Sequence, residues 1–227
     1  MSSLVFLVLF AIIGYVFGSI PTGYLYAKSK GIDIYKTGSN SPGATNIERT
    51  LGKSSGNIVL LLDILKTIIP VLINDFLFII FFFGSSFNQI FSNVTLNQQL
   101  RCVALFTGFF VVVGHDYPFT MKFKGGKGIS CSFATIICFS PPLAAILYIL
   151  QKLVSKTTKY VSAGSLFVLV AFPIFTVTGS LLKIYPFEFG INKYVLLISF
   201  LISILGIYRH RSNIDRLLKG NENKISK

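Results

Sequence analysis

The amino-acid sequence predicts an all-α polytopic integral membrane protein with about seven transmembrane helices, built as one membrane-embedded domain over residues 1–227. Hydrophobic residues make up 52% of the chain and charged residues only 13%, with a mean hydropathy of +0.70, which is too apolar for a soluble domain of this length. The apolar residues form separate long runs, and Lys and Arg fall mostly in the short segments between these runs. Such a pattern is typical of a chain that crosses a membrane several times.

Composition also argues against two kinds of site. The formal net charge of +13 would suit a nucleic-acid partner, but the 21 Lys and Arg residues form no continuous basic stretch, so we expect no nucleic acid. Cys102, Cys131 and Cys138 lie in apolar runs and have no metal-ligand spacing to one another or to the two histidines. We therefore expect ordinary buried cysteines, no metal and no cofactor.

The first apolar run, residues 4–27, is long enough to cross a hydrocarbon layer of about 30 Å. No Lys or Arg precedes it, so the charged start of a signal peptide is missing and we expect a retained first helix, which Pro21 should bend at its cytoplasmic end. The second run, residues 57–83, contains Asp63 and Lys66, which can pair at i,i+3. That pair is either purely structural or a support for the polar segment before it, and the sequence favours neither reading.

Charge decides the path of the later runs. The predicted spans after the second cover residues 101–113, 129–139, 143–153, 162–182 and 194–208. The fourth span is only about 16 Å of helix, yet Pro141 and Pro142 predict a turn directly after it. If the chain crosses there and returns through the fifth span, the lysines within residues 152–159 fall on the side of the other basic segments, as the positive-inside rule requires. The N-terminus is then outside and the C-terminus in the cytoplasm.

Residues 34–53 form a polar, glycine-rich segment between the first two apolar runs. Gly38, Gly43 and Gly52 supply tight turns and exposed backbone N–H groups among Ser, Thr, Asn and Arg side chains. This composition predicts a segment that holds an anion.

A second polar segment, residues 114–128, ends in Phe-Lys-Gly-Gly-Lys-Gly. It lacks the spacing of a Walker A loop, but a lysine between glycines where a loop enters a helix can cradle a phosphate with N–H groups, a helix N-terminus and a positive charge. The alternative is a basic loop that contacts anionic lipid. His115 lies at the end of the preceding span, where we expect structural support rather than catalysis.

The third polar segment, HRSNIDRLLKGNE, starts at His210 and follows the last span. Asn213, one turn later, shares nearly the same helix face, so the pair could orient or deprotonate a hydroxyl. Alternatively, His210 belongs to a basic anchor with Arg209 and Arg211. His210 and Asp215 also match the H-x-x-x-x-D signature of an unrelated enzyme superfamily, which we interpret as coincidence because helix positions five apart point about 140° apart.

Residues 18–52, 114–128 and 210–222 resemble, in that order, the three motifs of the bacterial PlsY family of membrane acyl-phosphate:glycerol-3-phosphate acyltransferases. Three motifs over nearly the whole chain make a specific match. The resemblance implies transfer of a fatty acyl group from acyl phosphate to the 1-hydroxyl of glycerol 3-phosphate, which forms lysophosphatidate and phosphate for phospholipid synthesis. It also implies a multi-pass cell-membrane protein with a cytoplasmic active site, coupled functionally to the soluble enzyme that makes acyl phosphate.

The resemblance also implies roles for individual residues. The matching catalytic positions are Ser39, His210 and Asn213. Contacts with substrate phosphate are expected from Thr45, Asn46, Arg49, Lys124, Gly125, Gly126, Lys127 and Gly128. The resemblance gives Glu222 a structural role, and the reading of the residues themselves adds structural support from Asp63, Lys66 and His115.

The sequence departs from the family pattern in three places. Asn40-Ser41-Pro42 stands where the family usually has Gly-Asn and a further residue, Tyr35 replaces a common arginine, and Ser130-Cys131 replaces Ala-Thr. These departures leave the local backbone geometry and the substrate affinity open.

A transporter or binding protein for a phosphate-ester lipid precursor is the main alternative function. Charges inside the membrane and broken helices would suit it, but the sequence contains no inverted repeat. Formation of lysophosphatidate from the two substrates would separate the enzyme from the transporter.

Overall fold

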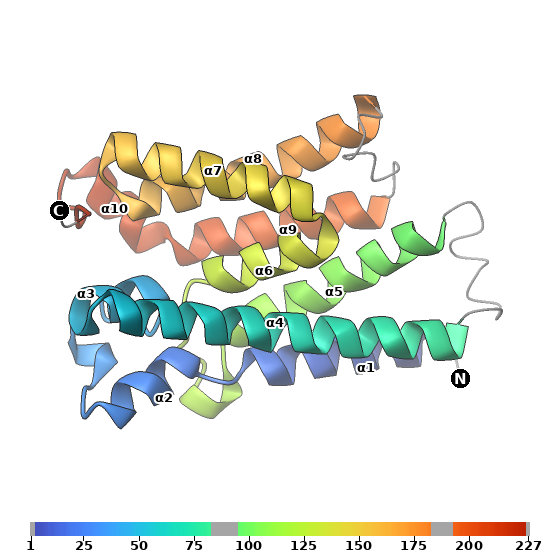
Figure 1. Cartoon of the computed structure of the whole chain (residues 1–227), viewed down its shortest axis with the longest axis horizontal. Coiled ribbons are helices and arrows are strands. Elements are labelled where there is room, and N and C mark those ends of the chain that lie inside the picture. The colour runs from blue at the N-terminus through green and yellow to red at the C-terminus, as the bar shows by residue number, and fades with distance from the viewer. Residues whose placement is uncertain (1–2, 83–94, 183–192, 226–227) are drawn as a thin grey trace. The chain divides into compact units, whose positions relative to one another are not determined.

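The computed structural model describes residues 3–82, 95–182 and 193–225, and within these ranges the chain forms helices and no strands (Figure 1). The all-α prediction is therefore confirmed for this part of the chain. The chain divides into two compact units, residues 1–138 and residues 139–227.

The first unit contains six α-helices and two short 3-10 helices among its described residues. They are α1 (Ser3–Gly18), α2 (Thr22–Ser29), η1 (Ile34–Lys36), α3 (Ala44–Leu51), α4 (Lys53–Phe82), α5 (Leu96–Asp116), η3 (Phe119–Met121) and α6 (Ile129–Phe139). The helices described in the second unit are α7 (Pro141–Thr158), α8 (Val161–Leu182), α9 (Lys193–Arg209) and α10 (Arg211–Leu218).

Within the described residues, the seven predicted apolar runs lie on helices, and the first of them is broken at residues 19–21. Within the described ranges, four helical stretches are long and apolar enough to cross a membrane, and the bent pair α9 and α10 can count as a fifth. Helix α6 has only 11 residues, as its sequence predicts. Seven crossings and their orientation stay a prediction. The predicted topology puts residues 84–94 and Lys183 on the outside, and these lie beyond the described residues.

The first span is interrupted where Pro21 predicts a bend. Helix α1 ends at Gly18 and α2 begins at Thr22. Proline lacks an N–H group and disfavours a helical residue before it, so the helix breaks just ahead of Pro21. The carbonyl of Ile20 in this break accepts a hydrogen bond from Lys66 Nζ on α4, at 3.0 Å.

Helices α1, α4 and α5 pack against one another in the first unit (Figure 1). Glycine allows the backbones of α1 and α5 to approach closely. A side-chain carbon at Gly18 would collide with the carbonyl of Val111, and one at Gly114 would collide with that of Tyr15. This close crossing holds His115, at the end of α5, beside the break in the first span.

In the second unit, α8 packs against both α7 and α9. The predicted turn at Pro141 is the start of α7, where Ser140 Oγ accepts a hydrogen bond from the backbone N–H of Leu143 at 3.4 Å. Helices α9 and α10 meet at a bend of 57°, and His210 stands at that bend.

Candidate active site

Asn46 organises the polar loop of the first motif. Its side chain is buried, its Nδ2 donates to the carbonyls of Thr37 and Ser41, and its Oδ1 accepts from the backbone N–H of Ser39, all at 2.9 Å. Gly38 has a φ of 62°, and a side-chain carbon there would collide with Asn46 Oδ1. The amide that we expected to contact phosphate is thus used to shape the loop that carries Ser39.

Asn40 is one of the residues at which the chain departs from the family pattern. Its φ of 55° lies in the left-handed region, which glycine adopts freely and which asparagine tolerates better than most other residues. The loop therefore keeps a left-handed residue at a position where the family usually has glycine.

Helix α3 carries the rest of the first motif. Ile47 is fully buried and packs with Ala27, Ile34 and Val59, which anchors the helix against its neighbours. Thr45 and Arg49 lie on the exposed side of α3. The helix therefore presents a hydroxyl and a guanidinium next to the Ser39 loop.

The second motif connects α5 to α6 through a loop tied to the first span. Tyr15 Oη donates to the carbonyl of Tyr117 at 3.0 Å, and Thr120 Oγ1 donates to the carbonyl of Ser19 at 2.8 Å. Lys127 and Gly128 directly precede α6, and Gly128 has a φ of 71°. The loop enters a helix at the glycine-flanked lysine, as the sequence predicts.

Gly126 lies against His115. Its backbone N–H donates to the carbonyl of His115 at 3.0 Å, so this group is used inside the protein. A side-chain carbon at Gly126 would collide with His115 Nε2, and one at Gly125 would collide with the carbonyl of His115. These glycines let the loop lie directly on His115.

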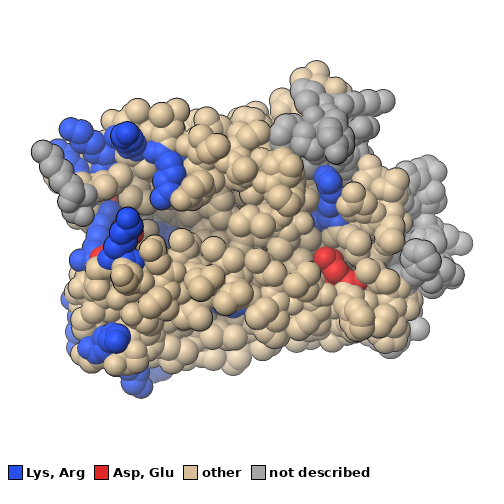
Figure 2. Space-filling view, viewed as in Figure 1, with Lys and Arg blue, Asp and Glu red and all other residues tan. Residues whose placement is uncertain are grey.

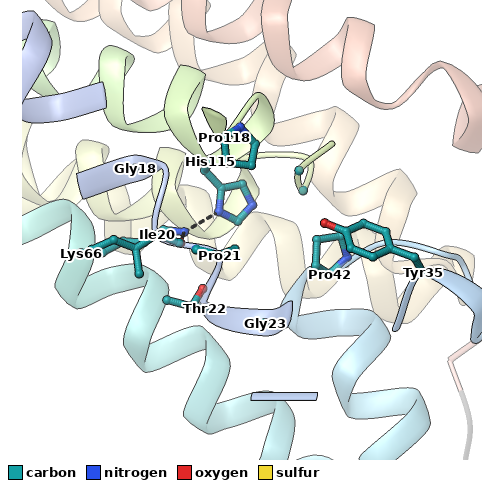
Figure 3. Close-up of a pocket in the computed structure, with 12 residues that line it drawn as sticks. Gly18, Ile20, Pro21, Thr22, Gly23, Tyr35, Pro42, Lys66, His115 and Pro118 are labelled. Atoms are coloured by element: carbon teal, nitrogen blue, oxygen red, sulfur yellow. Dashed lines mark hydrogen bonds between the residues drawn. The ribbon is translucent and has the colours of Figure 1, made fainter. Parts of the chain in front are cut away.

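A buried charged cluster lies beneath this loop. Lys66 Nζ is 2.9 Å from Asp63 Oδ1. It is also 2.9 Å from His115 Nδ1, as Figure 3 shows. Thr22 Oγ1, just after the break in the first span, donates to the same Asp63 oxygen at 2.6 Å. The predicted i,i+3 pair therefore exists, and it also joins α2, α4 and α5.

The partners of His115 indicate which of its nitrogens carries the proton. The Lys66 ammonium can only donate, so His115 Nδ1 accepts and the proton of the neutral ring resides on Nε2. Nε2 is the nitrogen that faces Gly126. His115 thus contacts both the buried Lys66 and the Gly126 end of the second motif, and it supports that motif from within the protein.

The same cluster is not built for a metal ion. Ligand atoms of Asp63, His115 and Cys131 lie within 4.8 Å of one another. The Lys66 ammonium, however, stands 2.9 Å from both the Asp63 oxygen and the His115 nitrogen, where it repels a cation and occupies its position.

A pocket opens where the first two motifs meet (Figure 3). Apart from Lys66, every residue that lines it belongs to one of these motifs. The lining consists of Gly18, Ile20, Pro21, Thr22, Gly23, Tyr35, Pro42, Lys66, His115, Pro118, Gly125 and Gly126. Four residues that we expected to bind phosphate or to support the site, namely Gly125, Gly126, Lys66 and His115, therefore share one pocket.

The sequence did not reveal the roles of Thr22 and Tyr35. Tyr35 Oη donates to the carbonyl of Lys124 at 2.6 Å and so joins the two motifs across 89 positions. Burial raises the pKa of Tyr35, and the neighbouring Tyr24 and Asp33 raise it further, so its hydroxyl remains protonated at neutral pH. Both residues stand inside the first motif, but nothing in the sequence pairs them with Asp63 or Lys124.

The third motif is held together within the second unit. Asn213 Nδ2 donates to Glu222 Oε1 at 3.1 Å, and Arg216 Nε donates to Glu222 Oε2 at 2.9 Å. His210 is buried, and its Nδ1 lies 2.8 Å from the carbonyl of Gly206. A carbonyl only accepts, so Nδ1 carries the proton and Nε2 carries the lone pair when the ring is neutral.

Asp215 stands apart from this arrangement. It is exposed on α10 and pairs with Lys219, with 2.9 Å between Lys219 Nζ and Asp215 Oδ1. The H-x-x-x-x-D match thus connects a buried histidine to an aspartate that is engaged with its own helix.

Comparisons with known proteins cover nearly the whole chain. A sequence model of the glycerol-3-phosphate acyltransferase family matches residues 8–220. Glycerol-3-phosphate acyltransferase 2 of Thermotoga maritima is 40% identical over 219 residues, which are 96% of each chain. A glycerol-3-phosphate acyltransferase of Aquifex aeolicus is 37% identical over 221 residues, which are 97% of this chain and 98% of the relative.

Two solved structures of PlsY, an integral membrane glycerol 3-phosphate acyltransferase, are also similar. The glycerol 3-phosphate form superimposes with a TM-score of 0.77 and 33% identity, over 97% of this chain and 96% of PlsY. The lysophosphatidic acid form gives a TM-score of 0.75 and 33% identity, over 97% and 95% of the two chains. The three sequence motifs and these full-length similarities agree, and this chain belongs to the glycerol-3-phosphate acyltransferase family.

Proposed function

We propose that this protein transfers a fatty acyl group from acyl phosphate to the 1-hydroxyl of glycerol 3-phosphate in phospholipid synthesis. The observation that carries the proposal is the junction of the first two motifs, where residues of both motifs lie together around the Lys66–His115 contact. The similar PlsY was solved in a glycerol 3-phosphate form and in a lysophosphatidic acid form, which correspond to the acceptor and the product of this reaction.

The donor is proposed from chemistry. An acyl phosphate is a mixed anhydride with a good leaving group, so the acceptor hydroxyl can attack its carbonyl carbon directly. The new ester bond forms, the bond to phosphate breaks, and inorganic phosphate leaves with the electron pair. Positioning and charge stabilisation can then supply most of the rate without a covalent enzyme intermediate. The sequence has no nucleotide fingerprint that would indicate coenzyme A.

The substrate phosphates are assigned to positive charges and hydrogen-bond donors of the first two motifs. Arg49 and Thr45 on the exposed side of α3, together with Ser39, form one group. Lys124, Lys127 and the backbone of Gly128 at the start of α6 form the other. Asn46 and Gly126 are assigned to shaping the site, because their polar groups bond within the protein.

The hydroxyl of the acceptor loses a proton as it attacks. Either the third motif or a phosphate of the substrate itself takes this proton. His210 Nε2 carries the lone pair because Nδ1 faces the carbonyl of Gly206. It can take the proton as a general base, or it can orient the hydroxyl with Asn213 while a substrate phosphate takes the proton. Glu222 holds Asn213 in place in both routes. We favour the orienting role, because an activated donor demands little from a base.

The chain is a multi-pass membrane protein by its apolar helices and its integral membrane relatives. We propose seven crossings, an outer N-terminus and an active site that faces the cytoplasm. In the first unit, Lys and Arg gather at the end that carries α2 and α3, which supports this orientation (Figure 2). A cytoplasmic site would let a soluble enzyme that makes acyl phosphate deliver its product directly.

One assay tests the function. Purified protein is incubated with acyl phosphate and glycerol 3-phosphate, and lysophosphatidate and free phosphate are measured. Equal amounts of both products are expected, and acyl-coenzyme A in place of acyl phosphate should give none. Movement of glycerol 3-phosphate into vesicles without an acyl donor, and no ester product with one, would favour the transporter instead.

A further inference from the structure

Tyr35 connects the first motif to the loop of the second motif. Its Oη donates to the backbone carbonyl of Lys124 at 2.6 Å, a short distance for a phenol hydroxyl and a carbonyl. Lys124 directly precedes Gly125 and Gly126, and Tyr35 lines the pocket together with both glycines. The hydrogen bond therefore reaches the part of the loop that faces the pocket.

The Tyr35 side chain is itself held firmly. Its backbone N–H donates to Asp33 Oδ1 at 3.2 Å, which caps the short helix η1. The next residue back, Ile34, is fully buried in the cluster that also anchors α3. The Tyr35 ring packs against Tyr24 on α2, with 5.9 Å between ring centroids. A residue fixed at its backbone and at its ring can act as a rigid strut.

The loop that Tyr35 contacts requires such support. Lys122 and Phe123 have φ values of 51° and 59°, which are unfavourable for residues with side chains and persist where the surroundings hold them. Gly125 and Gly126 follow, and these residues are held through their backbone, with the N–H of Gly126 donating to the carbonyl of His115. The bonds from Tyr15 and Thr120 secure the beginning of the loop, and the bond from Tyr35 secures it directly before the glycines.

We infer that Tyr35 is a positioning residue that holds the Lys124–Gly128 loop in its phosphate-binding conformation and thereby sets the affinity for a phosphate-bearing substrate. The inference rests on the proposed phosphate role of this loop. It concerns a residue at which this chain departs from the family pattern, so the bond between Oη and the Lys124 carbonyl is a feature of this chain's own residues.

The test is the Tyr35→Phe variant, which keeps the ring and removes only the donor. KM is measured separately for glycerol 3-phosphate and for acyl phosphate, because both substrates carry a phosphate. We expect roughly a threefold to tenfold higher KM for at least one of them, the effect of one net hydrogen bond, with kcat changed less than twofold. The substrate for which KM rises is the one whose phosphate the loop binds. Backbone amides of residues 122–128 should also exchange hydrogen faster in this variant.

Two further variants serve as controls for Tyr35→Phe. Tyr24→Phe makes the same chemical change on the ring that packs against Tyr35, and it should leave both KM values unchanged. Lys127→Gln tests the loop itself and should raise the same KM as Tyr35→Phe. If Lys127→Gln raises KM while Tyr35→Phe leaves KM and amide exchange unchanged, the role of Tyr35 is wrong and the loop assignment survives. If neither variant changes KM, both the inference and the phosphate role of the loop are wrong.

Discussion

Lys66 Nζ lies 2.9 Å from His115 Nδ1, and this single contact connects the second span to the end of α5 directly beneath the second motif. The same ammonium donates to the carbonyl of Ile20 in the broken first span. One lysine therefore joins three separate pieces of the chain at the floor of the pocket.

Removal of the Lys66 charge should destabilise the protein strongly. In Lys66→Met the Asp63 carboxylate remains buried with Thr22 as its donor and has lost the ammonium that paired with it. Breaking a buried ion pair in this way costs about 3–5 kcal/mol. We expect a clearly lower unfolding temperature for the purified protein in detergent. The double variant Asp63→Asn/Lys66→Met should recover much of the loss, and equal stability of Lys66→Met and wild type would contradict the buried pair.

Gly126→Ala should act through His115. The new methyl group collides with His115 Nε2, and overpacking of this kind costs about 1–3 kcal/mol. We therefore expect a lower unfolding temperature as well as lower activity. The matched test is the same substitution in a His115→Ala background, where the collision is absent and the additional loss should be small. Equal losses of stability and activity in both backgrounds would indicate that Gly126 binds the substrate phosphate directly.

Two substitutions at His210 separate a base from an orienting group. His210→Asn keeps a donor for the carbonyl of Gly206 but cannot titrate, whereas His210→Ala loses both functions. If a substrate phosphate takes the proton, kcat of His210→Asn should fall by no more than about 10²-fold. The activity of this variant should also still decrease at low pH, as the activity of the wild type does. His210→Ala should fall further. Equally deep losses in both variants, at unchanged KM and protein level, would indicate that the histidine is the base.

Cysteine labelling tests the orientation. In a cysteine-free background, Lys156→Cys near the end of α7 should react with an impermeant maleimide only from the cytoplasmic side. Lys193→Cys at the start of α9 should react only from outside, because the proposed topology puts the beginning of the last span on that side. Labelling of Lys156→Cys from outside would overturn the proposed return through residues 143–153.

Local features of this protein could be predicted from the sequence because they depend on neighbouring residues. The apolar runs determine the helical membrane fold, Pro21 breaks the first span, and residues 129–139 form the short helix that their length allows. The Asp63–Lys66 pair follows from i,i+3 spacing on one helix. The order of the three motifs determined the family.

Only the tertiary structure decided how the polar groups are used. The sequence contains Asn46 and Gly126 as candidate phosphate donors, but the fold bonds one to its own loop and the other to His115. Tyr35 meets Lys124 across 89 positions. These partners depend on how closely the helices and loops approach, above all where glycines bring α1 onto α5, and that approach follows from packing between distant segments, which no local pattern of residues encodes.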